Sequence, residues 1–160
     1  MYRRCLAILS LVLLSMLANF SAAAQTSCTV STTPVAFGNY SSFSSSSTDS
    51  SGNISVRCQA FVALLIPYSV SLTTGGSGTY SGRTLRSGTS RINYQLYSDL
   101  TRTQVWGDGT GGSQPLPGSI LLSLGSLNVA NTHTVFGRIL ARQNSPAGTY
   151  TDTIQIVVTY

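Results

Sequence analysis

Residues 148–160, Gly-Thr-Tyr-Thr-Asp-Thr-Ile-Gln-Ile-Val-Val-Thr-Tyr, alternate polar and apolar side chains, and this pattern constrains the fold most. Successive side chains of an extended strand point to opposite faces, so every second residue shares one side. Most residues of this stretch are β-branched or aromatic, the types that fit a pleated sheet. The pattern predicts a strand with one buried face, which consists of Ile154, Ile156, Val158 and Tyr160.

The turn signal Pro-Ala-Gly at 146–148 precedes this strand, and the sequence stops inside the strand pattern at Tyr160. A buried strand in a sandwich needs a neighbour on each side, and no later segment of this sequence supplies one. We therefore expect an incomplete sheet whose groove is lined by the apolar face of the last strand and filled by another polypeptide.

The rest of the sequence consists of short apolar runs separated by Gly, Ser and Pro, without a sustained helical period. About seven short strands of this kind predict an all-β sandwich that forms a single domain, with no internal repeat. Before the terminal strand, the expected strand segments are 28–31, resumed at 34–38, then 54–58, 61–66 ended by Pro67, 68–72, 92–96, 120–124 and 132–141.

The N-terminus has the features of a secretory signal peptide. Arg3 and Arg4 precede the apolar run 6–17, and the alanines at 22–24 form an A-x-A cleavage site. A membrane anchor is the alternative, but an apolar run of about twelve residues is too short to span a bilayer. We therefore expect a signal peptide at 1–24 and a mature domain at 25–160.

The charges of the predicted mature chain are few and scattered. It contains seven Arg, four Asp, no Lys and no Glu. Recognition of nucleic acid would require a basic patch or stripe, and the sequence shows none. A surface rich in Ser, Thr and Gly suits an extracellular β-protein, so no nucleic-acid partner is expected.

Two cysteines, Cys28 and Cys58, remain after the signal peptide. An even number of cysteines in an exported chain favours a disulfide. A metal site is the alternative, but two Cys and one His without CxxC spacing do not match a zinc motif. We therefore predict a disulfide and no metal.

The candidate catalytic features are weak. The glycine-rich loop 107–112 lacks the Lys of a phosphate-binding loop, and Asp108 is its only carboxylate. His133 is the only histidine, no nucleophile-elbow motif is present, and Glu is absent. We expect His133 to be a structural or surface residue, and we expect neither catalysis nor a cofactor.

The most apolar segment of the mature chain, 61–66, allows two interpretations. It is either a buried strand or an exposed apolar loop that marks a contact surface. The sequence alone leaves both open. The candidate contact residues are Phe61, Val62, Leu64, Leu65 and Ile66.

Several motifs in order resemble the spore coat protein U domain, the pilin module of archaic, Csu-type chaperone–usher pili. The resemblance covers 28–160. It rests on Cys-Thr-Val-Ser at 28–31, Pro-Val-Ala-Phe-Gly at 34–38, Val-Trp-Gly-Asp-Gly-Thr-Gly-Gly at 105–112 and Pro-Ala-Gly-Thr-Tyr-Thr-Asp-Thr at 146–153.

This resemblance implies an immunoglobulin-like β-sandwich that lacks its last strand. It implies that a periplasmic pilus chaperone lends a strand, which another pilin subunit's donor strand replaces at the outer-membrane usher. The implied function is that of a structural subunit of an adhesive fimbrium at the cell surface, with roles in attachment to abiotic or host surfaces and in biofilm formation. The alternatives are a self-sufficient secreted carbohydrate- or surface-binding module and, less strongly supported, a hydrolase built on Ser and His133.

One feature departs from the family pattern. Polymerising subunits carry a donor segment of about ten residues or more before the first cysteine, near the length of a long strand. Here only Gln25, Thr26 and Ser27 lie between the expected cleavage site and Cys28. This departure predicts a subunit at the tip of the pilus.

Overall fold

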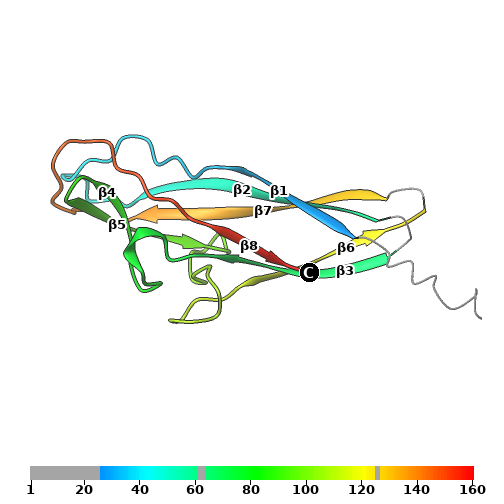
Figure 1. The fold of residues 1–160 in the computed structure, drawn as a ribbon. Coiled ribbons are helices and arrows are strands. Elements are labelled where there is room, and N and C mark those ends of the chain that lie inside the picture. Colours follow the sequence, from blue (N-terminus) through cyan, green and yellow to red (C-terminus); the bar gives the residue numbers. More distant parts are fainter. Residues whose placement is uncertain (1–25, 61–63, 125–126) are drawn as a thin grey trace, which may run out of the picture.

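The computed structural model describes residues 26–60, 64–124 and 127–160, which form two antiparallel sheets packed on one apolar core (Figure 1). The expected signal peptide and two predicted contact residues, Phe61 and Val62, lie outside the described residues. No helix within the described ranges is long and apolar enough to cross a membrane.

The larger sheet has the strand order β1-β2-β7-β5-β4, and the smaller sheet has the order β6-β3-β8. A short 3-10 helix, η1 (Gly75–Ser77), follows β3. The strands are β1 (Ser27–Thr33), β2 (Thr48–Gln59), β3 (Leu64–Leu72), β4 (Arg83–Ser87), β5 (Ser90–Tyr97), β6 (Leu116–Leu122), β7 (Asn128–Ile139) and β8 (Ile156–Thr159).

The predicted alternation along the central strands is confirmed by burial. Every second residue of β2, β3 and β5 points into the core, as the two-residue period of a strand requires. Trp106 is fully buried between the sheets, and its Nε1 donates a hydrogen bond to the Val70 carbonyl at 2.8 Å. The predicted inward residues, all buried, are Ile54, Val56, Cys58, Tyr68, Val70, Leu72, Ile92, Tyr94 and Leu96.

The predicted disulfide is present. Cys28 of β1 and Cys58 of β2 lie directly opposite each other and are joined. The closed loop has a sequence separation of 30 residues. Restricting the unfolded chain in this way stabilises the fold by about 3–4 kcal/mol.

Two predicted strand boundaries are wrong. Pro67 does not end a strand, because β3 runs through it from Leu64 to Leu72. β8 pairs with β3 only from Ser69 onward, so the missing N–H of Pro67 faces an edge without a ladder. Residues 34–38 form no strand; they leave β1 and cross the inner face of the larger sheet, where Val35 and Phe37 approach Gly137.

The terminal strand is shorter than its sequence pattern, since β8 covers Ile156–Thr159. Upstream of β8 the chain instead pairs with β4, through an isolated bridge between Thr151 and Arg86. The sequence did not predict β4 at all. Its inward residue Arg83 interrupts the apolar alternation that identifies a strand.

Candidate functional site

β8 forms an open edge of the smaller sheet, since β3 is its only partner strand among the described residues. The N–H of Thr73 donates to the carbonyl of Gln155 at 3.0 Å, so Gln155 faces β3. Because N–H and C=O groups of successive strand residues point to opposite sides, those of Ile156 and Val158 face away from β3. They constitute an unpaired edge ladder.

β1 forms the facing rim. Within the described ranges it pairs only with β2, and Val30 lies directly opposite Val56. Opposite residues of an antiparallel pair share one face, so both side chains point toward the core side. Val56 is fully buried, yet Val30 is 42% exposed, which shows that the smaller sheet does not cover β1.

An open groove runs between these two rims. Its narrower part is a cavity of about 330 Å³, and it continues into a wider part of about 850 Å³ between residues 34–43 and 145–152. Side chains of both sheets form the floor of the narrower part. This floor includes Ile54, Leu72, Leu85, Tyr94, Leu96 and Val135.

The opposite side of the sandwich is closed. There β6 packs against β7, and the Asn131 side chain donates to the Ser119 carbonyl at 2.7 Å. Among the described residues the two sheets are therefore joined on this side, whereas the groove lies on the side of β1 and β8.

Residues 34–38 build the wall of the groove opposite β8. Phe37 packs edge-on against Tyr94, with ring centroids 5.9 Å apart. Gly137 permits this crossing, since a Cβ there would lie 2.7 Å from atoms of both Val35 and Phe37. The Ser50 hydroxyl also holds the Ala36 carbonyl at 2.6 Å.

Of the four residues predicted to line a groove, Ile154 and Ile156 line its narrower part, whereas Val158 and Tyr160 are not among its lining residues. Ile154, Ile156 and Val158 are half-buried and pack against the core, whereas Tyr160 is 57% exposed. Occupation of the groove by another polypeptide stays a prediction. Sequence reasoning missed Val30, although it follows Cys28 in the alternation of β1.

The groove contains one carboxylate among its described lining residues, Asp152. Tyr94 donates its hydroxyl to Asp152 at 2.7 Å, and the N–H of Gly76 donates at 2.9 Å. Burial raises the pKa of the Tyr94 phenol, which stays a protonated donor. Asp152 therefore acts as a fixed polar anchor within an otherwise uncharged groove.

The described part of the candidate contact segment 61–66 is partly buried strand and partly exposed apolar surface. Ile66 is buried at 5% exposure, whereas Leu64 and Leu65 are exposed to 38% and 58%. On β6 and just beyond it, Leu121 and Leu124 are exposed to 68% and 84%. Leu65 and Leu121 lie directly opposite each other, and with Leu124 they define a leucine patch.

His133 has a structural environment. Its Nε2 lies 2.6 Å from the Tyr68 hydroxyl, and its ring packs edge-on against Trp106. Desolvation lowers its pKa. No group of three or more potential metal ligands occurs in the part of the chain that the structure describes.

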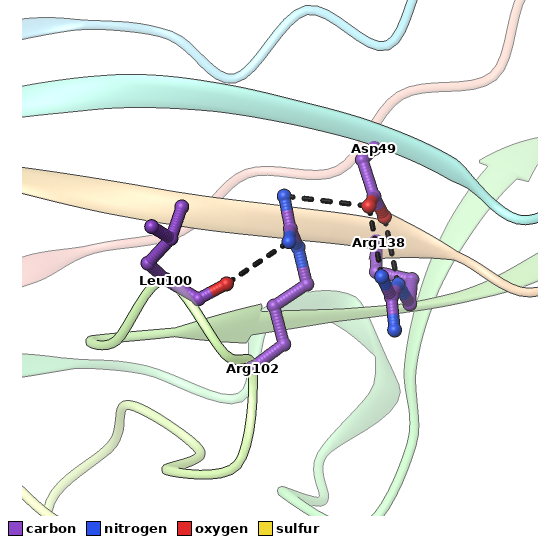
Figure 2. A network of polar contacts seen from close by, with 4 residues as sticks. All are labelled: Asp49, Leu100, Arg102 and Arg138. Carbon is purple, nitrogen blue, oxygen red and sulfur yellow. Dashed lines mark hydrogen bonds and ion pairs between the residues drawn. The ribbon is translucent and has the colours of Figure 1, made fainter.

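A polar network on the larger sheet lies outside the groove (Figure 2). Arg138 donates through Nε and Nη2 to Asp49 at 2.7 and 2.8 Å, and Arg102 lies 3.4 Å from the same carboxylate. Arg102 also donates to the Leu100 carbonyl at 3.1 Å. The hydrogen bond from Arg138 lowers the pKa of Asp49. The network fastens the loop after β5 to the sheet.

Comparison with known families identifies the chain. The model of the Spore Coat Protein U domain matches residues 14–157. The chain belongs to this family. Protein U of Myxococcus xanthus is similar to this Spore Coat Protein U domain chain, with 29% identity over 113 residues. That match covers 68% of this chain and 59% of the relative.

A solved structure has a similar fold. It is the CsuC–CsuE chaperone–tip adhesion subunit pre-assembly complex from archaic chaperone-usher Csu pili of Acinetobacter baumannii. The TM-score is 0.53 at 21% identity, over 85% of this chain and 40% of the other chain. The Spore Coat Protein U domain chain thus spans less than two thirds of both relatives.

Proposed function

We propose that this chain is a structural subunit of an archaic chaperone–usher pilus and that its open groove accepts a strand from another polypeptide. The observation that carries the proposal is that two features border the same groove: an edge of β8 without a partner strand and an uncovered apolar rim on β1. An added strand satisfies the backbone groups of Ile156 and Val158 and covers Val30, which completes an immunoglobulin-like sandwich.

The energetic reason is burial of apolar surface. Val30 and Tyr160 are exposed, and Ile154, Ile156 and Val158 are half-buried. At roughly 25 cal/mol per Å², covering five such side chains contributes several kcal/mol. An unfilled groove of this kind exposes an apolar surface beside a strand edge, a combination that favours aggregation.

The partners follow from this chemistry and from the family. A periplasmic chaperone lends a strand to the groove, and a donor segment of another pilin subunit replaces it at the outer-membrane usher. The chain is then exported through the periplasm to the cell surface. No catalytic step is part of this role.

A tip position fits the predicted N-terminus. Cleavage after Ala24 leaves Gln25, Thr26 and Ser27 before Cys28, and three extended residues reach about 10 Å. A groove-filling strand of five or more residues spans about 17 Å. N-terminal sequencing tests the premise, since cleavage well before Ala24 contradicts it. Immunogold labelling tests the position, and label spread evenly along the shaft contradicts the tip.

The leucine patch is the surface proposed for attachment. Leu65 and Leu121 are exposed and lie opposite each other on the neighbouring strands β3 and β6, and Leu124 is exposed just beyond β6. Exposed contiguous apolar side chains on a secreted protein mark contact surfaces. Attachment to abiotic or host surfaces through this patch would support biofilm formation.

The decisive experiment is co-expression with an archaic-type periplasmic chaperone of the same host. We expect a soluble complex of the two proteins, and a lower periplasmic yield with a tendency to aggregate when the chaperone is absent. Full yield of a monomer that binds no chaperone would contradict the proposal. That result would instead favour a self-sufficient secreted binding module.

A further inference from the structure

We propose that Arg83 is a positioning residue that fixes where the open edge of β8 begins. This inference rests on the proposed function of the groove as a strand acceptor. Arg83 lies on β4, outside the groove lining, and is fully buried. It acts on β8 through the Thr73 carbonyl.

All of the hydrogen bonds of Arg83 go to neutral acceptors, and its guanidinium also lies 5.2 Å from the centre of the Tyr80 ring. Nε and Nη2 donate to the Thr73 carbonyl at 3.1 and 2.9 Å, and Nη2 also donates to the Trp106 carbonyl at 2.7 Å. Nη1 donates to Oε1 of Gln95 at 2.6 Å. No ion pair involving Arg83 occurs among the residues described. Burying an unpaired charge is costly unless its donors are satisfied, so this geometry depends on all three acceptors.

The contact with Arg83 changes the pairing of Thr73 with Gln155. A regular antiparallel pair exchanges two backbone hydrogen bonds. Here the Thr73 N–H donates to the Gln155 carbonyl at 3.0 Å, but the Gln155 N–H donates to the Thr73 hydroxyl at 2.9 Å. The Thr73 carbonyl is occupied by Arg83. The regular β3–β8 ladder therefore ends at this pair.

Upstream of Gln155 the chain that forms the wall of the groove no longer pairs with β3 and pairs with β4 instead. Arg86 and Thr151 exchange two backbone hydrogen bonds, at 2.8 and 3.0 Å. The narrow part of the groove lies beside Ile154 and Ile156, and the wide part lies beside residues 145–152. By ending the ladder at Thr73, Arg83 determines which residues offer an edge to a donor and where the groove widens.

The surrounding contacts hold the other side of β3 in place. Tyr80 donates its hydroxyl to the Leu72 carbonyl at 2.8 Å, and Trp106 donates Nε1 to the Val70 carbonyl at 2.8 Å. Gln95, the partner of Arg83, donates to the Tyr80 carbonyl at 2.7 Å. The end of β3 is therefore fixed from both sides, and Arg83 supplies the side that faces β8.

The first arm of the test measures amide hydrogen exchange by NMR, relative to the amide of Val56 in β2. Without Arg83, the Thr73 carbonyl is free to accept the Gln155 N–H. This restores the regular pair and allows the β3–β8 ladder to continue to residues before Gln155. In Arg83→Met we expect the Thr151 amide to exchange at least about tenfold faster, because its bond to Arg86 is lost. The control is Arg91→Met, because Arg91 is an exposed arginine on β5, and there the exchange rate of the Thr151 amide should not change. Equal exchange in both variants would overturn the proposal.

A second substitution keeps the test falsifiable if Arg83→Met does not fold. Thr73→Val removes the hydroxyl and leaves Arg83 in place. In this variant we expect about tenfold faster exchange of the Gln155 amide and an unchanged rate at the Thr151 amide. Thr73→Ser keeps the hydroxyl and should retain the wild-type rates at both amides. Faster exchange at Thr151 in Thr73→Val would contradict the assignment to Arg83.

The second arm measures binding of the chaperone named in the proposed function. We expect Arg83→Met to bind about tenfold more weakly than Arg91→Met, when both are compared at temperatures equally far below their melting points. Equal affinities would overturn the positioning role. Absence of a complex with the wild-type chain would contradict the proposed function alone, because the exchange arm tests Arg83 without a partner.

Discussion

Val30 and Val56 lie directly opposite each other on β1 and β2, yet Val56 is fully buried and Val30 is 42% exposed. Both side chains point to the core side of the sheet. β2 lies inside the larger sheet, whereas β1 is its edge strand and faces the groove. This difference within one cross-strand pair marks the edge at which the smaller sheet leaves the larger sheet uncovered.

The two valines should respond differently to truncation. Val56→Ala should destabilise the isolated chain by about 2 kcal/mol, since it leaves a cavity in the core. Val30→Ala should change it by less than about 0.5 kcal/mol, as is usual for an exposed side chain. Urea unfolding measures both. In the chaperone complex the cost of Val30→Ala should rise, and an unchanged cost would contradict occupation of the groove.

A charge on the inner side of β8 should prevent accumulation in the periplasm. Ile156→Asp places a carboxylate in the groove, where it meets apolar side chains and an incoming strand. The matched control is Val157→Asp, because Val157 is the next residue and points outward at 49% exposure. Immunoblots of periplasmic extracts should show loss of the first variant and near-normal levels of the second. Equal levels of both variants would count against the groove.

The disulfide should contribute measurably to stability. Replacing both Cys28 and Cys58 by Ser should lower the free energy of unfolding by about 3 kcal/mol. Intact-mass spectrometry of the exported protein should show a gain of about two hydrogens on reduction. A titre of two free thiols in the unreduced protein would contradict the bond.

The free energy of unfolding should decrease as the pH falls, because His133 is protonated more readily in the unfolded chain. Desolvation lowers its pKa below the ordinary value of 6.5, and its Nε2 lies 2.6 Å from the Tyr68 hydroxyl. The unfolded chain therefore binds more protons as the pH falls through 6.5, which favours unfolding until the pH is below the folded pKa. Since His133 is the only histidine, His133→Gln should flatten urea-unfolding stability between pH 7.5 and 5. The same slope in both proteins would exclude this origin.

Much of the sandwich could be predicted from alternation, because strands with one buried face reveal their period directly. Ile54, Val56 and Cys58 of β2 are an example. β4 could not be predicted, since a buried Arg83 takes the place of an apolar residue. Pro67 was misleading for a tertiary reason: its missing N–H points to an edge where β8 has already ended.

The groove was predictable on one side only. Ile154, Ile156 and Val158 follow from the pattern of the last strand. The opposite wall at 34–38 requires the chain to leave one sheet and cross its face, which Gly137 permits. No periodicity within 34–38 encodes such a crossing, so this wall and the wide part of the groove emerged only from the structure.

Hydrogen exchange at Ile156 and Val158 tests the central claim most directly. Their N–H groups face the open edge of β8, whereas the N–H of Val157 faces β3 and provides an internal reference. In the isolated chain we predict fast exchange at Ile156 and Val158. In the chaperone complex or in assembled pili we predict exchange at least about a hundredfold slower at both residues, since a donor strand then pairs with them. Fast exchange at Ile156 and Val158 in those assemblies would contradict strand acceptance by this groove.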